Sequence, residues 1–412
     1  MSDTSTPQSA EVGAVRAEVR AWLAENWSPD RPKREYAEAL ADSGWGAPTW
    51  PAQWCGRGLP ATMRRFVTEE FRRVGARGSG QDITNLFANV VLAHGTDDQK
   101  RRWVRPLVTG EIRGCLLYSE PGAGSDLAAV QTRAERVGDG WAMNGQKVWT
   151  SGAHISQVGL LLARTNWDLP KHRGVTFFMF TLDQPGVEVR PIRQVTGGAH
   201  FNEVFLTDAH ASDDDVLGDV DGGWSVLQTA LGFERNIMGA ESAKSKDDPR
   251  AAPDKDSPWT RVVGGTDYVE LARSSGLSGH DDIRQAVARL YSREQVNRWN
   301  TLRVRAERRQ GVASPVASLG KLAMSRIVHD AVELTSTMLG ASSMLDGDDD
   351  PVAAEVNRSS FAAFVTSIGG GTDQIQRNII GERILGLPKE PELDKNVPFR
   401  EVRKASATRS FG

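Results

Sequence analysis

The chain has 412 residues, of which 39% are hydrophobic, and a formal net charge of −3 at pH 7. A chain of this length buries a sizeable core, and we expect two or three domains. The slightly acidic balance, with no basic stripe that carries aromatic residues, argues against a nucleic-acid partner. Two cysteines, Cys55 and Cys115, are too few for a metal cluster and do not suggest a disulfide framework.

Neither terminus nor interior carries a membrane signal. The first ten residues are polar and lack the apolar centre of a signal peptide. No stretch approaches the ~18 apolar residues that a membrane span needs. These features predict a soluble, cytoplasmic protein.

The first quarter of the chain has the apolar spacing of helices. Between Val12 and about Arg113 an i, i+4, i+7, i+8 pattern begins with Val15, Val19, Trp22 and Leu23. A stretch rich in Pro, Gly and Trp, from Gly44 to Pro60, interrupts it. We therefore expect a helical domain with one long loop.

Between Cys115 and about Leu217 the pattern changes to short β-strands. Apolar or β-branched runs separated by turn residues are Val158 to Ala163, Val175 to Leu182, Val187 to Ile192 and Val204 to Leu206. The dipeptide Asn144-Gly145 predicts a hairpin turn inside the segment Trp141 to Trp149. A compact barrel or sandwich would accommodate these strands.

Helical patterns return from Asp221, which we expect to cap a helix carrying Trp224, Leu227 and Leu231 on one face. Further helical patterns run from Ile283 towards Gly311, from Leu319 to Met338, and from an N-cap at Thr372 with Ile375 and Ile379 facing inward. Four such helices suit a four-helix bundle. The charged, Pro-containing segment Ser242 to Ser257 predicts an exposed insertion, and its composition favours a solvated loop over a functional lid.

The predicted fold class is α+β with three parts. The boundaries that follow are an N-terminal helical domain at 1–113, a middle β domain at 114–218, a C-terminal helical bundle at 219–390 and a tail at 391–412.

Two short segments carry the chemistry. The first, Leu116 to Ala128, contains Gly122-Ala-Gly-Ser125, whose small side chains let backbone N–H groups approach an anionic or carbonyl-rich ligand. Its alternative is an ordinary tight loop. The second, Gly145 to Gly152, supplies the ring of Trp149 with the hydroxyls of Thr150 and Ser151. Taken alone, a Trp at a strand end such as Trp149 is more commonly a core aromatic residue.

The order of the three parts, helical, β and helical, together with these two segments, resembles the acyl-CoA dehydrogenase family. The resemblance covers roughly Val12 to Pro388. Further matching landmarks are Gly44 to Pro51, Gly222 to Trp224, Phe233 to Arg235 and Gly370 to Pro388. The resemblance implies FAD bound between the β domain and the bundle. It assigns as cofactor contacts Leu116, Tyr118, Ser119, Gly124, Ser125, Trp149, Thr150, Ser151, Thr372, Asp373 and Gln374. Independently of the family, Thr372 to Gln374 open a helix, whose free N–H groups suit a polar ligand.

The reaction implied is removal of an α proton from an acyl-CoA thioester while a hydride leaves the β carbon for the flavin. The family's usual base, a Glu before Gly-Thr, is replaced here by Gly370. This chain resembles the isovaleryl-CoA and long-chain members of the family, which carry the base on the first bundle helix and a small residue at the position of Gly370. The resemblance therefore implies Glu234 as the candidate base. Its alternative is a surface helix glutamate. Gly370 keeps a backbone N–H for the thioester oxygen.

Three residues are expected to meet the substrate. Ser125 is assigned to the CoA moiety by the resemblance, against the alternative of a loop hydroxyl that bonds its own backbone. Arg235 orients Glu234, contacts CoA or forms a surface ion pair. Gly371 is assigned to the substrate beside Gly370. The vacant position 370 favours a medium, branched or ring-bearing acyl group.

One departure leaves part of the cofactor site unassigned. The family commonly carries an Arg-x-x-Phe-Gly sequence for the flavin pyrophosphate of the neighbouring subunit, and none occurs between Gly239 and Gly311. The expected partners are an electron-transfer flavoprotein and further subunits, in a homodimer, homotetramer or heterotetramer. The alternatives are a non-catalytic or FAD-sharing subunit of a heteromer, and a flavin oxidase or hydroxylase on the same fold.

Overall fold

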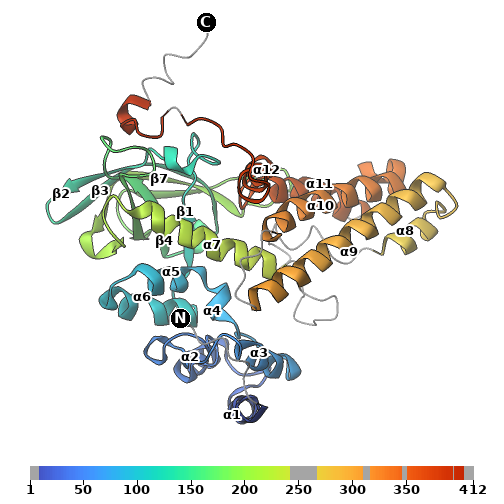
Figure 1. The fold of residues 1–412 in the computed structure, drawn as a ribbon, viewed down its shortest axis with the longest axis horizontal. Coiled ribbons are helices and arrows are strands. Elements are labelled where there is room, and N and C mark those ends of the chain that lie inside the picture. The colour runs from blue at the N-terminus through green and yellow to red at the C-terminus, as the bar shows by residue number, and fades with distance from the viewer. Residues whose placement is uncertain (1–8, 242–266, 310–315, 346–349, 393, 403–412) are drawn as a thin grey trace, which may run out of the picture.

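The computed structural model describes residues 9–241, 267–309, 316–345, 350–392 and 394–402. Helices come first, a β-sheet follows and helices return after it, which is the α+β order expected from the sequence (Figure 1). The predicted insertion from Ser242 to Ser257 lies outside the described residues.

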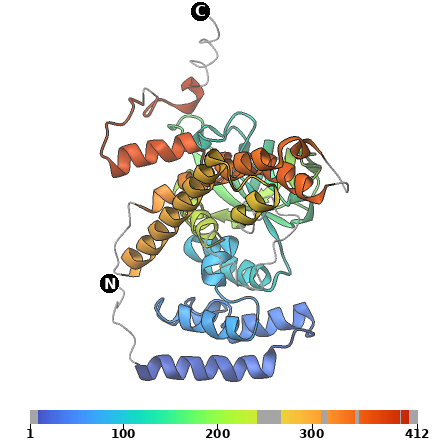
Figure 2. The ribbon, with the colours of Figure 1, turned by 90° about the vertical axis from the view of Figure 1, so that its right-hand side faces the viewer.

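The N-terminal helices form the lower part of the molecule in both views (Figures 1 and 2). They are α1 (Ser9–Asn26), α2 (Lys33–Ser43), α3 (Arg64–Arg73), α4 (Gln81–Thr84), α5 (Leu86–His94) and α6 (Asp97–Thr109). The predicted apolar face of α1 is confirmed, because Val19 and Leu23 are buried in a cluster with Phe71 of α3. Helices α5 and α6 instead pack under the sheet, where their apolar residues join its core.

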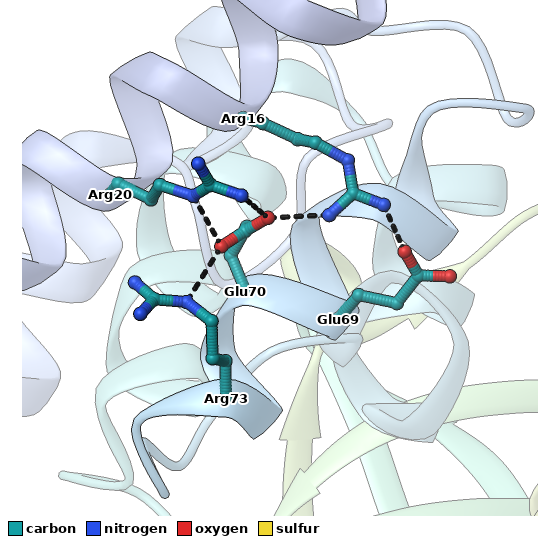
Figure 3. A network of polar contacts seen from close by, with 5 residues as sticks. All are labelled: Arg16, Arg20, Glu69, Glu70 and Arg73. Atoms are coloured by element: carbon teal, nitrogen blue, oxygen red, sulfur yellow. Dashed lines mark hydrogen bonds and ion pairs between the residues drawn. The ribbon is translucent and has the colours of Figure 1, made fainter.

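A buried carboxylate joins α1 to α3 (Figure 3). Glu70 of α3 is only 1% exposed and accepts hydrogen bonds from Arg20, at 2.7 and 2.9 Å, from Arg73, at 3.1 Å, and from Arg16. Arg16 also contacts Glu69, whose side chain is 45% exposed. The hydrogen bond from Arg20, followed by those from Arg16 and Arg73, outweighs burial and lowers the pKa of Glu70 to about 2.

The middle of the chain forms one eight-stranded sheet. Its strands are β1 (Gly114–Leu117), β2 (Arg133–Val137), β3 (Gly140–Ser151), β4 (Val158–Arg164), β5 (Val175–Thr181), β6 (Val187–Pro191), β7 (Phe201–Ser212) and β8 (Val216–Leu217). The order is β6-β7-β3-β2-β4-β5-β8, with β1 pairing in parallel to β4. All four strand runs expected from the sequence coincide with strands, except that Leu182 and Ile192 lie one residue beyond β5 and β6. Strand β4 is buried along its whole length.

The predicted hairpin turn at Asn144-Gly145 is wrong. Strand β3 runs through both residues, and the turn lies earlier, at Gly138 and Asp139 between β2 and β3. The register of β3 against β7 shifts between Met143 and Gly145, as in a β-bulge. A Cβ on Gly145 would lie 2.6 Å from Oγ1 of Thr132, so this glycine permits close approach of the neighbouring chain.

Helix α7 (Gly223–Glu241) follows the sheet and lies against α5 and β5. Asp221 does not cap it. The Asp221 carboxylate accepts hydrogen bonds from Thr165 at 2.5 Å and Asn166 at 3.2 Å, so it fastens the chain before α7 to the connection between β4 and β5.

The C-terminal helices are α8 (Tyr268–Ser274), α9 (Asp281–Arg309), α10 (Ala317–Leu339), α11 (Pro351–Ile368) and α12 (Asp373–Ile379). The sequence predicted α9, α10 and α12 but not α11, which packs along α10. Thr372 caps α12 as expected, accepting a hydrogen bond from the N–H of Ile375 at 3.2 Å. Among the described helices none is both long and apolar enough to cross a membrane.

After α12 the chain returns to the β domain, over the top of the molecule in Figure 1. Phe399 is buried there, and its ring centroid lies 3.7 Å from the guanidinium carbon of Arg164 in β4. Burial lowers the pKa of Arg164 to about 10. The N–H groups of Phe399 and Arg400 donate to the carbonyls of Leu169 and Trp167, each at 3.0 Å, so this segment is part of the fold.

Glu70→Gln tests the ion cluster between α1 and α3. Removing the one buried carboxylate leaves three guanidinium groups without their shared partner, and we expect a loss of about 3 kcal/mol in the free energy of unfolding. The measurement is a urea unfolding curve at pH 7. Glu69→Gln, which removes an exposed pair, is the control and should cost less than about 1 kcal/mol. Equal effects of the two substitutions would contradict the assignment.

The same experiment has a defined pH dependence. The pKa of Glu70 is lowered to about 2 in the folded protein, below the ordinary value of about 4.3. The stabilisation is therefore fully present above the ordinary value and is lost as the pH falls towards 2. The difference between wild type and Glu70→Gln should shrink over that range.

Candidate active site

The loop after β1 is tightly turned and open to solvent on one side. The N–H groups of Glu120 and Ala123 each donate to the other's carbonyl, at 2.9 and 3.0 Å. Gly122, Gly124 and Ser125 are exposed, and a Cβ on either glycine would meet nothing within 4 Å. The backbone of this loop is therefore accessible to a ligand.

A buried ion pair holds the base of this loop. Lys147 of β3 has no exposed surface, and its Nζ donates to Oε1 of Glu120 at 2.8 Å and to the carbonyls of Tyr118 at 3.1 Å and Leu162 at 2.7 Å. Nζ thus has three acceptors for its three protons. The ammonium joins β1, β3 and β4 at one point.

The Glu120 carboxylate of this pair also has hydrogen-bond donors at both of its oxygens. Oε1 of Glu120 also accepts from the N–H of Thr132 at 2.8 Å, and Oε2 accepts from the N–H of Gln131 at 2.6 Å. Burial acts to raise the pKa of Glu120, but the ammonium of Lys147 and these N–H donors outweigh it, so the pKa is lowered. Burial lowers the pKa of Lys147, and the charge of Glu120 opposes that effect. The three acceptors around Nζ and the three donors around the carboxylate suit the charged forms, and the pair connects the loop to the chain ahead of β2.

The end of β3 presents an aromatic ring. Trp149 has a φ of 61°, rare for a residue with a side chain, and is 61% exposed. Its ring meets that of Phe201 edge-on at 6.0 Å. Thr150 is buried, and its hydroxyl has no hydrogen-bond partner among the described residues, while Ser151 is half-buried. Trp149 is thus not the core residue that its type alone would suggest, since most of its ring is open to a ligand.

The turn into α12 is fixed from α10. Both carboxylate oxygens of Asp373 are engaged, one by Lys321 at 3.2 Å and the other by Ser325 at 2.8 Å. Ser325 also bonds Ser367, at 3.0 Å, which in turn bonds His329 at 2.6 Å. The Asp373 side chain therefore serves the helix packing, which leaves its backbone N–H for a ligand. Gln374 is exposed.

The backbone just before α12 adopts a conformation that favours glycine. Gly370 and Gly371 have φ values of 65° and 91°, in the region that favours glycine. Nε2 of Gln376 donates to the carbonyl of Gly370 at 3.3 Å and would lie 2.9 Å from a Cβ on Gly371. The backbone is thus held in a fixed turn just before α12.

Glu234 lies half-buried on α7, next in the chain to Phe233, which packs against the apolar core under the sheet. Burial raises the pKa of the Tyr118 phenol far above its ordinary value, and the negative charge of Glu234 raises it further. Tyr118 is 5% exposed and its ring stands 5.6 Å from that of Phe177 in β5. The side chain of Arg235 lies outside the described part of the structure.

Three contacts set the position of α7. The sequence indicated Trp224 and the landmark Gly222 to Trp224, but it did not predict the partners of these residues. A Cβ on Gly223 would lie 2.7 Å from the backbone N of Phe177, so only glycine lets the helix start this close to β5. The ring of Trp224 meets that of His172 edge-on at 4.7 Å. Five residues before Glu234, the hydroxyl of Thr229 bonds Nε2 of His94 in α5 at 2.9 Å.

The missed residues left different signals. Lys147 stands inside the quoted segment Gly145 to Gly152, and a lysine in a strand that buries its neighbours is a recognisable exception. Gly223 stands in the landmark Gly222 to Trp224, but its contact with β5 joins distant parts of the chain and has no local signal.

Comparison with known proteins identifies the family. Residues 9–111 match the model of the acyl-CoA dehydrogenase N-terminal domain, residues 115–209 that of the middle domain and residues 262–385 that of the C-terminal domain. The chain belongs to the acyl-CoA dehydrogenase family. It is accordingly an acyl-CoA dehydrogenase, an oxidoreductase that uses FAD.

Individual relatives agree over nearly the full length. The chain is 35% identical over 407 residues to acyl-CoA dehydrogenase IpdE1 of Mycobacterium tuberculosis, covering 92% of this chain and 99% of that one. A chain of the ChsE4-ChsE5 complex from Mycobacterium tuberculosis is 26% identical with a TM-score of 0.63, covering 94% and 100%. A chain of the Tcur3481-Tcur3483 steroid ACAD, 24% identical over 94% and 100%, has the same fold with a TM-score of 0.69.

The described residues fit the flavin that this family carries. The open backbone at Gly122 and Gly124 leaves room for a ligand, and the exposed ring of Trp149 offers a flat apolar contact. The capped N-terminus of α12 adds free N–H groups. FAD, with rings and a pyrophosphate, matches these three kinds of surface.

Lys147→Met tests the buried ion pair. It leaves the Glu120 carboxylate buried without its partner, at a cost of about 3 to 5 kcal/mol, and frees the loop at Gly122 to Ser125. We expect a sharp fall in the FAD bound per chain and a lower melting temperature. The combined variant Lys147→Met with Glu120→Gln removes both charges and should recover part of both losses. Full FAD content in the single variant would contradict this role.

Gly223→Ala tests the placement of α7. The added methyl group meets the backbone of Thr176 and Phe177, so the helix must shift, and we expect flavin reduction by acyl-CoA to slow by about 10-fold or more. Gly232→Ala, on the same helix with nothing within 4 Å, is the matched control. It should keep the wild-type rate and gain about 0.5 to 1 kcal/mol of stability.

Proposed function

We propose that this chain dehydrogenates an acyl-CoA thioester between its α and β carbons, with Glu234 as the base. The Glu234 carboxylate takes the α proton while the β carbon loses a hydride, and a carbon-carbon double bond forms. When bound, FAD supplies the acceptor for that hydride. Both electrons and the proton are thereby accounted for.

One observation carries the choice of base. The family's usual position is occupied by Gly370, which has no side chain, whereas Glu234 lies half-buried beside the buried phenol of Tyr118. A half-buried carboxylate next to an apolar core is poorly solvated, and desolvation strengthens it as a base. Its position on α7, a helix fixed by Gly223 and by Thr229, supports a fixed direction for proton transfer.

Gly370 has a different role in this proposal. The thioester oxygen gains negative charge as the α proton leaves, and a backbone N–H aimed at it stabilises that charge. The turn at Gly370 and Gly371, with positive φ at both residues and a hydrogen bond from Gln376, is suited to hold such a donor. The absence of a side chain at 370 leaves room for a medium, branched or ring-bearing acyl group.

We assign the remaining cofactor and substrate contacts mainly to segments of the chain that are open to a ligand. We assign FAD to the loop of Leu116, Tyr118, Ser119, Gly124 and Ser125, to Trp149, Thr150 and Ser151, and to Thr372, Asp373 and Gln374. Asp373 would contribute its N–H, because its carboxylate binds Lys321 and Ser325. Ser125, Arg235 and Gly371 are assigned to the substrate, and Ser125 is exposed at the open side of the loop.

The electrons would pass to an electron-transfer flavoprotein, and the active assembly would contain further subunits. Large apolar side chains stand exposed on two bundle helices, among them Trp299 of α9, 62% exposed, and Phe364 of α11, 58% exposed. Such exposure supports a subunit interface. The relative named ChsE4-ChsE5 is a complex of two proteins. A heteromeric subunit is therefore the second candidate, distinguished by whether the purified chain alone binds FAD.

Glu234→Gln tests the proposed base. The amide cannot accept the proton, so we expect flavin reduction by a good acyl-CoA substrate to slow by about 10³-fold while FAD stays bound. The measurement is anaerobic stopped-flow absorbance at the flavin band. Glu333→Gln, at an exposed position on α10, is the matched control and should keep the wild-type rate. A near-normal rate in Glu234→Gln would falsify the assignment.

A further inference from the structure

The phenol of Tyr118 is a buried polar group to which the proposed reaction assigns no role. Its side chain is buried in the core that the sheet shares with α5, α6 and α7. Its hydroxyl is shielded from solvent and has no hydrogen-bond partner among the described residues. Burial of a hydroxyl removes its hydrogen bonds to water, and this is unfavourable unless another hydrogen-bond partner replaces the water.

The backbone and ring of Tyr118 are fixed from two sides. Its carbonyl accepts from Nζ of Lys147 at 3.1 Å, and its ring packs at 5.6 Å from Phe177. Phe177 belongs to the part of β5 against which Gly223 starts α7. The tyrosine thus stands between the flavin loop and the helix that carries Glu234.

Two observations place Glu234 near the phenol of Tyr118. Phe233, the neighbour of Glu234, packs on the same core cluster as Tyr118. The charge of Glu234, together with burial, keeps the phenol protonated, since the two raise its pKa. A protonated phenol beside a carboxylate acts as a hydrogen-bond donor.

We propose that Tyr118 is a positioning residue for Glu234, whose carboxylate accepts a hydrogen bond from the Tyr118 hydroxyl when acyl-CoA fills the site. This inference rests on the proposed role of Glu234 as the base. Hydrogen bonds of this kind tighten in the substrate complex and are often unformed before it. The bond favours the charged carboxylate, so the base stays ready at lower pH.

Other ionisable groups lie on the elements packed against these two side chains. They are His94 of α5, Asp82 of α4, Arg164 of β4, Lys147 of β3 and Glu120 of the flavin loop. Asp82 is paired with Arg64 at 2.7 Å, and Lys147 with Glu120 at 2.8 Å. His94 has its pKa lowered by burial, so it is the group whose titration must be separated from that of Glu234.

Tyr118→Phe is the test, because it removes the hydroxyl and keeps the ring. The rate of flavin reduction is measured against pH with saturating acyl-CoA. We expect the acid limb of the profile to move up by about one pH unit, so that the rate falls about 10-fold below the limb and changes little above it. The same shift should appear in the His94→Gln background.

Stability and FAD content separate this role from a structural one. Tyr118→Phe deletes only a buried hydroxyl that has no hydrogen-bond partner among the described residues, and it keeps the backbone that the loop offers to FAD. The FAD content should therefore be kept, and the melting temperature should be unchanged or raised. Tyr36→Phe is the matched control. The Tyr36 hydroxyl donates to the carbonyl of Arg77 at 2.9 Å, so its loss should lower the melting temperature and leave the pH profile unchanged.

Two outcomes overturn the inference. An unmoved acid limb with an unchanged rate means that the hydroxyl does not reach Glu234. A raised KM with an unmoved acid limb means that it contacts the substrate instead. Neither outcome touches the proposed base, which fails separately if Glu234→Gln keeps a near-normal rate of flavin reduction.

Discussion

The buried pair of Lys147 and Glu120 is the interaction on which the site depends. Two charges taken out of water are costly unless each is fully satisfied, and here the ammonium has three acceptors and the carboxylate three donors. These bonds join the end of β1, the strand β3, the strand β4 and the chain before β2. The glycine loop and the Trp149 strand end, the two segments proposed to contact FAD, are both held to this one point.

The second constraint is the close packing of α7 on the sheet. Gly223 allows contact with β5, Trp224 meets His172, and Thr229 is bonded to His94. These contacts fix a helix whose later turn carries Glu234. The glycine loop and the helix that carries Glu234 are thus placed independently, the loop by an ion pair inside the sheet and the helix by packing under it.

Local patterns in the sequence predicted the elements well where one short segment determines the structure. The cap at Thr372 and the strands from Val158 and Val175 are of this kind. The error at Asn144-Gly145 arose because a turn signal was read locally, whereas Gly145 is required by contact with Thr132. The carboxylate of Asp373 could not be placed either, since its partners Lys321 and Ser325 lie about 50 positions away, on α10. Tertiary contacts decided both positions.

The most direct measurement is an anaerobic titration of the purified chain with acyl-CoA thioesters, followed by the visible absorbance of its flavin. The account predicts close to one FAD per chain and bleaching of the flavin band by a medium, branched or ring-bearing acyl-CoA. A chain that purifies without flavin and does not take up added FAD would contradict it. So would bound FAD that no acyl-CoA of these classes reduces.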